Sequence, residues 1–89
     1  MPSISMFYGI IIYMYGQDNK KHKMPHVHAK YAGKYSVFSL RTGEKIEGKM
    51  PTKQAQFVKT WILLRQEELL ADWELALNGE HPYDIEPLR

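Results

Sequence analysis

The spacing of apolar residues changes at Pro51, and this change constrains the fold more than any other feature of the sequence. Before Pro51, side chains of different character alternate, as in HVHAKY at 26–31, which is the period of a β-strand. After Pro51, the apolar residues Ala55, Val58 and Ile62 recur at the spacing of one helix face. Strands followed by helices are typical of an α+β fold.

The part of the chain before Pro51 contains four stretches with the composition of strands, namely 5–15, 26–31, 35–40 and 45–50. We interpret the first, SMFYGIIIYMY, as a single long strand in which Gly9 marks a bulge or a close backbone approach. Turns around Gly33 and Gly43 separate the later stretches. Short turns join neighbouring antiparallel strands, so we expect a meander of three to four strands.

The part of the chain after Pro51 predicts helical structure over about residues 52–78, with a bend or break near 65–67. Trp61 and Trp73 lie within the apolar stripes, so both are expected in the core. The acidic side chains of this region are expected to form a solvated helix face: Glu67, Glu68, Asp72 and Glu74. An extended tail at 80–89 is expected to dock on the sheet through Ile85 and Leu88.

These elements predict a single α+β domain over residues 1–89, with strands at about 5–50, helices at about 52–78 and the tail at 80–89. The small antiparallel sheet of three to four strands is expected to be packed on one side by one or two C-terminal helices. The other face of the sheet is then available as a partner surface.

Composition excludes several classes of protein. The chain has no cysteine, which rules out disulfides, cysteine-based zinc sites and a thiol nucleophile. Its longest apolar run is far shorter than the roughly 20 residues of a membrane span. The opening MPSISMFYG lacks the basic start of a secretory signal. We therefore expect a cytoplasmic protein that does not act on membranes.

Charge is distributed unevenly along the chain. Residues 1–50 carry eight basic and three acidic side chains, whereas residues 51–89 carry four basic and seven acidic ones. A basic half can attract phosphate or an acidic protein partner. The alternative is an ordinary solvated surface on which lysines protect strand edges. The acidic half can also meet the basic half of a second copy, which makes a homodimer plausible.

His26 and His28 are two positions apart on a predicted strand, so their side chains point to the same face. The first interpretation is structural, with both rings shaping a surface. The second is acid–base chemistry on RNA, because imidazole titrates near neutral pH. The other residues that would bind RNA or a partner are Lys21, Lys23, Lys30 and Arg41 for phosphate, and Tyr15 or Tyr31 for base stacking.

Metal binding is the third interpretation of this histidine pair. It needs a third ligand from His22, Asp18 or Glu44, and two histidines on one strand are a weak signal. We therefore assign no metal ligand and expect no cofactor.

Five motifs in series, MPSISMFYGIII, PHVHAKY, GEKIEGKMP, ELLADWELALNG and IEPL, resemble a family of small bacterial proteins catalogued as domain of unknown function 4160. The loop GQDNKKHKMP departs from that pattern because it is longer and richer in lysine. The family has no agreed activity, but its members are often paired with another small protein encoded alongside. The resemblance therefore implies a toxin-like component of a toxin–antitoxin-type gene pair.

A toxin-like component would act through protein or RNA binding, with RNA or the ribosome as its target. Its partner would be a small antitoxin-like protein encoded nearby. The alternatives are a metal-independent ribonuclease-type enzyme that uses His26 and His28, or a small metal-binding domain.

Overall fold

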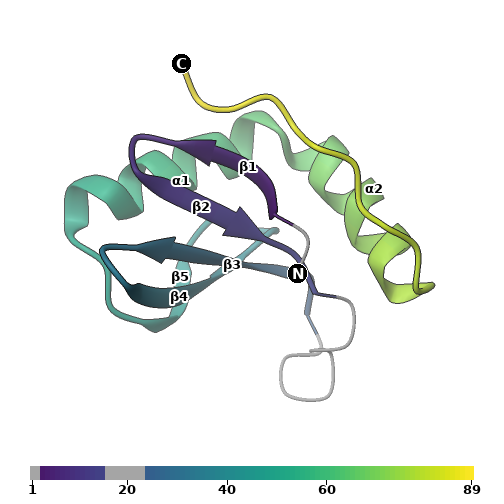
Figure 1. The fold of residues 1–89 in the computed structure, drawn as a ribbon, viewed down its shortest axis with the longest axis horizontal. Coiled ribbons are helices and arrows are strands. Elements are labelled where there is room, and N and C mark those ends of the chain that lie inside the picture. Colours follow the sequence, from purple (N-terminus) through teal and green to yellow (C-terminus); the bar gives the residue numbers. More distant parts are fainter. Residues whose placement is uncertain (1–2, 16–23) are drawn as a thin grey trace.

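The computed structural model describes residues 3–15 and 24–89, which form one antiparallel sheet and two helices (Figure 1). The sheet has five strands in chain order: β1 (Ser3–Phe7), β2 (Ile10–Tyr13), β3 (His26–Tyr31), β4 (Lys34–Ser39) and β5 (Lys45–Gly48). The helices follow as α1 (Thr52–Leu64) and α2 (Gln66–Leu77). The α+β prediction is confirmed, with one strand more than expected.

The additional strand arises because residues 5–15 do not form one strand. Tyr8 and Gly9 both have positive φ, 49° and 78°, and turn the chain back between β1 and β2. Two central residues with positive φ define the type I′ hairpin, whose twist matches that of the flanking strands. Ala32 and Gly33, with φ of 52° and 78°, connect β3 to β4 in the same way. The role of Gly9 is therefore a turn rather than a bulge.

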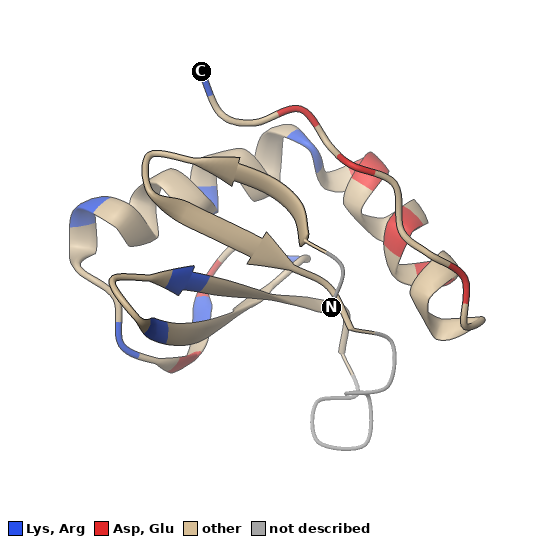
Figure 2. Cartoon of the chain, viewed as in Figure 1, with Lys and Arg blue, Asp and Glu red and all other residues tan. Residues whose placement is uncertain are grey.

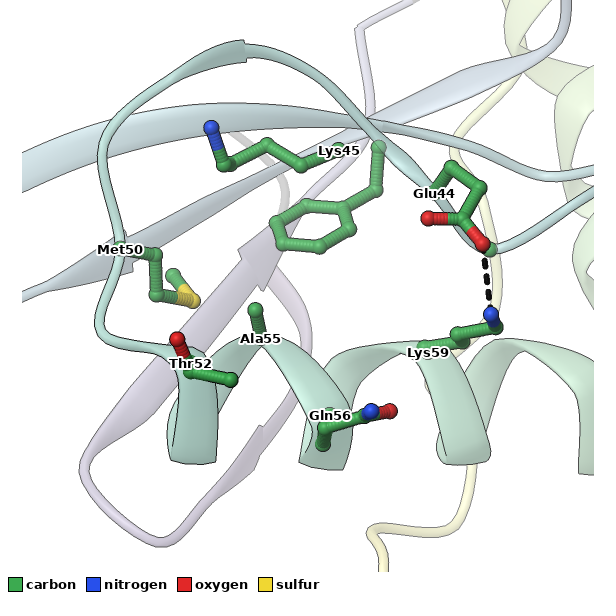
Figure 3. A pocket seen from close by; sticks show the side chains of 9 residues that line it. Glu44, Lys45, Met50, Thr52, Ala55, Gln56 and Lys59 are labelled. Carbon is green, nitrogen blue, oxygen red and sulfur yellow. Dashed lines mark hydrogen bonds and ion pairs between the residues drawn. The ribbon is translucent and has the colours of Figure 1, made fainter.

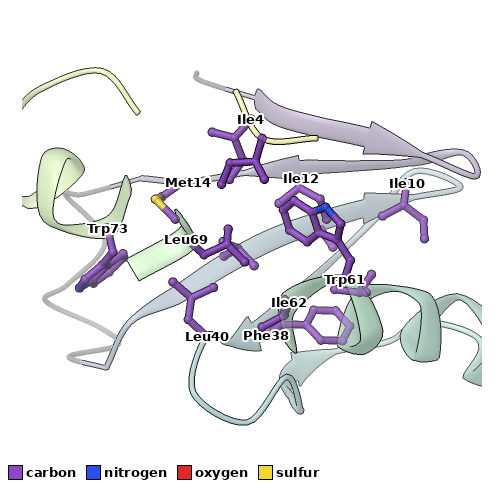
Figure 4. Packing of buried hydrophobic residues seen from close by; sticks show 14 of the residues in the cluster. Ile4, Ile10, Ile12, Met14, Phe38, Leu40, Trp61, Ile62, Leu69 and Trp73 are labelled. Atoms are coloured by element: carbon purple, nitrogen blue, oxygen red, sulfur yellow. The ribbon is translucent and has the colours of Figure 1, made fainter. Parts of the chain in front are cut away.

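Both helices contribute apolar side chains to a core beneath one face of the sheet (Figure 4). Trp61 from α1 and Trp73 from α2 are buried, which confirms the expectation for both indoles. The helical region breaks at Arg65, as predicted, where φ of −113° and ψ of 23° separate α1 from α2. Neither α1 nor α2 combines the length and the apolar character that a membrane crossing requires.

The tail after α2 returns to the first strand. The Ile85 N–H donates to the Ile4 carbonyl at 2.8 Å, and Ile85 is buried as expected. The Trp61 Nε1–H donates to the Glu86 carbonyl at 2.7 Å and fixes the same segment over the core. The outer edge of β1 is therefore covered by the chain itself.

Asp72 corrects the expectation of a fully solvated acidic helix face. Its side chain is only 3% exposed, whereas the neighbouring Glu68 is exposed. Its Oδ1 accepts a hydrogen bond from the Tyr83 N–H at 3.0 Å, which ties α2 to the returning tail. Burial raises the pKa of the Asp72 carboxyl, a hydrogen bond from Tyr83 lowers it, and the charges of Asp84 and Glu68 raise it further. Helix periodicity did not predict the burial of Asp72, because the segment that covers its side chain is the tail and not a part of α2.

Candidate nucleic-acid interface

The face of the sheet opposite the helical core carries a group of aromatic and basic side chains. Side chains alternate across each strand, so the buried Ile12, Val27 and Phe38 point toward the helices and their neighbours point away. The pairing register aligns the outward side chains of β2, β3 and β4 in rows. We call this surface the tyrosine face and define it by Ile11, Tyr13, Tyr15, His28, Lys30 and Tyr35.

The rings of the tyrosine face contact one another across three strands. Tyr13 and Tyr15 lie nearly parallel, with 6.1 Å between centroids and 7° between planes. The ring of Tyr13 is 6.4 Å from that of Tyr35, which is 48% exposed. Lys30 Nζ lies 5.5 Å from the Tyr35 centroid, a cation–π distance. A row of aromatic rings next to an ammonium group therefore crosses the centre of the sheet.

His26 and His28 lie side by side, with 5.4 Å between ring centroids, but their environments differ. His26 is fully buried and packs 4.9 Å from the ring of Trp73, at the end of the sheet that α2 covers. His28 is partly exposed and meets the edge of the Tyr15 ring at 4.7 Å. Of the two imidazoles, His28 is therefore the one that a ligand on the tyrosine face would touch.

A hydrogen bond to a backbone carbonyl orients the His26 ring. His26 Nδ1 lies 2.9 Å from the carbonyl oxygen of Met24. A carbonyl can only accept, so Nδ1 must carry the hydrogen, and the neutral ring then has its lone pair on Nε2. His26 therefore acts as a fixed support beside His28.

The described part of the chain contains no set of three side chains placed to bind a metal ion. Within residues 3–15 and 24–89, no group of three or more histidine or acidic side chains is placed to hold an ion. Two of the proposed third ligands, His22 and Asp18, lie outside the described residues. The third, Glu44, is paired with Lys59 on the α1 side of the sheet.

The structure brings together only some of the residues predicted for this site. Tyr15, His26, His28 and Lys30 are grouped as described, and Lys21 and Lys23 lie outside the described residues.

Tyr31 points to the opposite side of the sheet and packs against the core. Arg41 is exposed just beyond the end of β4 at which Ser39 pairs with His26. Lys30 pairs with Tyr35 near the opposite end of β4. Gln66 Nε2 donates to the Arg41 carbonyl at 2.9 Å and holds that turn beside α2. Tyr31 and Arg41 are therefore separated from the tyrosine face.

Two residues of the face, Tyr13 and Tyr35, were missed by sequence reasoning. Tyr13 shares the alternation of Tyr15, and Tyr35 belongs to a strand whose two faces were recognised. The alternation that places Tyr13 and Tyr35 on one face was therefore visible in the sequence, but alternation alone does not show which face of the sheet the helices cover.

Charges are distributed unevenly in space, as they are along the chain, although Glu44 and Glu47 lie among the lysines near β5 (Figure 2). Among the described residues, Lys30, Lys34, Lys45, Lys49, Lys53 and Lys59 lie on the strands β3 to β5, the segment after β5, and α1. Acidic side chains gather on α2 and the tail, where they include Glu67, Glu68, Asp72, Glu74, Glu80, Asp84 and Glu86. The tyrosine face therefore belongs to the basic part of the molecule.

The fold and this face define a class of small α+β protein in which helices cover one side of an antiparallel meander and aromatic and basic residues occupy the other. The chain belongs to the DUF4160 family, a domain of unknown function, whose model matches residues 9–74. The matched segment contains the whole tyrosine face and both histidines. No curated protein and no solved structure matches the chain.

Proposed function

We propose that this chain is the toxin-like component of a two-gene pair and acts by binding single-stranded RNA on the tyrosine face. The gene pair is suggested by the resemblance described above. RNA binding is supported by one observation, the row of contacting rings from Tyr15 through Tyr13 to Tyr35 with Lys30 beside it.

Sheet surfaces with aromatic side chains on adjacent strands are a recurrent way to bind unpaired bases. Each base stacked on an aromatic ring contributes about 1–3 kcal/mol, and stacking tolerates any sequence because every base has a flat face. Lys30 and the other lysines of this half supply the positive charge that a phosphate backbone requires.

The test is fluorescence anisotropy of a labelled 12-nucleotide single-stranded RNA titrated with the protein. Tyr35→Ala removes one stacking ring and is expected to weaken binding about 5- to 100-fold. Tyr83→Ala is the matched control, because Tyr83 is 74% exposed on the tail and makes none of the ring contacts of this face. Lys30→Ala is expected to reduce the slope of log affinity against log salt by about 0.7. Equal binding by wild type and Tyr35→Ala would refute the RNA interface.

The toxin-like role has a separate readout in growing cells. Induced expression is expected to inhibit growth, and the double variant Tyr13→Ala, Tyr35→Ala is expected to relieve the inhibition while remaining folded. Co-expression of the neighbouring gene's product is expected to relieve it for the wild type by forming a stable complex. Absence of any growth effect at confirmed expression counts against the toxin-like role and leaves the anisotropy result unaffected.

A metal-independent ribonuclease activity is a second candidate, favoured by the oriented His26 ring beside the partly exposed His28. Neutral His28 would accept the proton of a ribose 2′-hydroxyl as its oxygen attacks the phosphorus. The bond to the 5′-oxygen would break, and that oxygen would receive the proton from the imidazolium. Lys30 would stabilise the developing negative charge.

Cleavage of end-labelled RNA in the presence of EDTA tests this second candidate. His28→Ala is expected to lower the cleavage rate at least about 100-fold while RNA affinity changes little. His81→Ala, on the tail, is the matched control. If His28→Ala cleaves RNA at the wild-type rate, the acid–base role of this residue is wrong.

A further inference from the structure

The rows of outward side chains that form the tyrosine face continue onto the first strand. The pairing register places Met6 of β1 opposite Ile11 of β2. Ile11 is opposite Lys30, which is in turn opposite Tyr35. Directly opposed residues of antiparallel strands point to the same face, so these four side chains form one row across the sheet. Met6 is 65% exposed, so the row ends at an exposed apolar side chain on β1.

A pocket of about 430 Å³ lies at this end of the row, between the outer face of β1 and β2 and the returning tail. We call it the β1 pocket; its lining is mostly apolar and includes Met6, Ile11 and Tyr13 from the strands and Asp84 and Pro87 from the tail. Pockets that bind small ligands typically have volumes of about 300–1,000 Å³. Because Ile11 and Tyr13 also belong to the tyrosine face, a ligand bound on that face reaches the pocket directly.

A second cleft, of about 320 Å³, lies between the β5 side of the sheet and α1 and lacks this connection (Figure 3). Its lining shares no residue with the tyrosine face. Glu44 and Lys59 both line it and form an ion pair with each other, so each of these charges already has a partner. The β1 pocket, and not this cleft, is therefore continuous with the tyrosine face.

Asp84 gives the β1 pocket a hydrogen-bonding character of its own. It is the one carboxylate among the described residues of the lining, and it is exposed. An ionised carboxylate only accepts hydrogen bonds. The Watson–Crick edge of guanine carries two neighbouring donors, N1–H and the N2 amino group, which match the two oxygens of a carboxylate. Adenine, cytosine and uracil each place an acceptor beside the donor on this edge, and that acceptor would repel the second oxygen.

The charges around the row determine how a strand of RNA would lie on it. Lys30 lies two strands away from Met6 in the same row, a separation of about 10 Å. The acidic Asp84 and Glu86 of the tail repel phosphate, whereas the lysines of β3 to β5 attract it. The phosphates are therefore favoured over β3 and β4, with a base extending from them toward the tail.

We propose that the β1 pocket binds a guanine base of single-stranded RNA and gives the tyrosine face a sequence preference. The base lies on Met6 and Ile11 beside the ring of Tyr13, and its N1–H and N2 amino groups donate to the Asp84 carboxylate. Stacking on the tyrosines accepts any base, whereas this contact requires the donor pattern of guanine. The inference rests on the proposed RNA binding and adds the base that the site selects.

Fluorescence anisotropy compares a labelled 12-nucleotide oligouridine with the same oligomer carrying one central guanine, at one salt concentration. We expect the guanine to strengthen binding about 5- to 100-fold, which is the effect of one bidentate contact to a base. Replacing that guanine by adenine should remove the gain. Replacing it by inosine, which keeps N1–H and lacks the N2 amino group, should remove most of it. The oligouridine reports binding to the tyrosine face without the pocket.

Two variants, each with a matched control, test the two halves of the pocket. Asp84→Asn replaces an acceptor oxygen by a donor and should bring the affinities for the two oligomers within about twofold of each other. Glu80→Gln removes the same charge from an exposed tail residue outside the lining and should keep the guanine preference. Met6→Ala removes apolar contact with the base and should reduce the preference at least about threefold. Leu64→Ala, at 68% exposure on α1, should leave it unchanged.

The ε-methyl group of Met6 reports whether the base occupies the pocket. In a sample labelled with methyl-¹³C methionine, its signal is assigned by its loss in Met6→Ala. The ring current of a bound base shifts a nearby methyl signal, so the Met6 signal should move with the guanine oligomer and move much less with oligouridine.

A guanine preference that Asp84→Asn loses and Glu80→Gln keeps supports the inference. It is overturned if wild type binds both oligomers equally, if adenine or inosine serves as well as guanine, or if the two variants behave alike. A Met6 signal that shifts with protein concentration in the absence of RNA would assign the pocket to a second copy and also overturn it. If oligouridine still binds and Tyr35→Ala weakens that binding, the guanine pocket alone is wrong. If no oligomer binds, the RNA interface fails together with it.

Discussion

Replacement of Gly48 by alanine tests how tightly β5 is held against the sheet. Gly48 has φ of 90°, and a Cβ at this position would lie 2.4 Å from the Tyr35 carbonyl oxygen and 2.8 Å from Ser36 Cα. Both neighbours belong to the backbone of β4, so neither can move aside as a flexible side chain would. Gly48→Ala must therefore distort the pairing of β5 with β4.

The expected magnitude has two parts that a second glycine separates. A left-handed conformation costs an alanine about 1–2 kcal/mol. Forcing extra volume into a packed site adds typically about 1–3 kcal/mol. Gly33 has φ of 78° with nothing within 4 Å of its added Cβ, so Gly33→Ala carries only the first cost. The free energy of unfolding should therefore fall by about 1–3 kcal/mol more in Gly48→Ala than in Gly33→Ala.

Urea unfolding followed by the fluorescence of Trp61 and Trp73 measures both variants, since both indoles are buried. With an m-value of about 1 kcal/mol/M for a small domain, the two midpoints should differ by about 1–3 M. Equal midpoints would mean that β5 moves away from β4 at no cost, so that the close approach of Gly48 to Tyr35 and Ser36 does not affect stability.

Two further predictions concern the packing of the tail. Because burial raises the pKa of Asp72 above its usual value of 3.8, the folded state binds this proton more tightly than the unfolded state. The resulting stabilisation is complete below pH 3.8 and is lost as pH rises through the raised pKa of the folded state. In urea titrations, the free energy of unfolding of Asp72→Asn should therefore increase relative to that of wild type as pH rises through this window. A difference between the two proteins that does not change with pH would contradict the raised pKa of Asp72. Trp61→Phe keeps an apolar ring but removes the donor to the Glu86 carbonyl, so the Ile85 amide should exchange with solvent faster by hydrogen exchange, with a global loss of about 1 kcal/mol. Unchanged exchange at Ile85 would show that the indole hydrogen bond does not hold the tail.

The order of strands and helices was readable from the sequence because it depends on local periodicity. The break at Arg65 and the burial of Trp61 and Trp73 followed from the apolar stripes alone. The division of residues 5–15 into two strands did not, because Tyr8 had to adopt positive φ beside Gly9. That conformation is rare for a bulky residue and is imposed here by the pairing of β1 with β2.

The sequence by itself determined the fold class and the alternation that puts His26 and His28 on one side of their strand, because both depend on residues close in the chain. Only the tertiary structure decided that α2 covers His26 while His28 stays partly exposed, and that Asp72 is buried under the tail. It also decided that the tail reaches the β1 edge, whereas β5 is the last strand at the other edge within residues 3–15 and 24–89. These outcomes depend on which distant segments meet, and periodicity along one strand or helix carries no information about its packing partner.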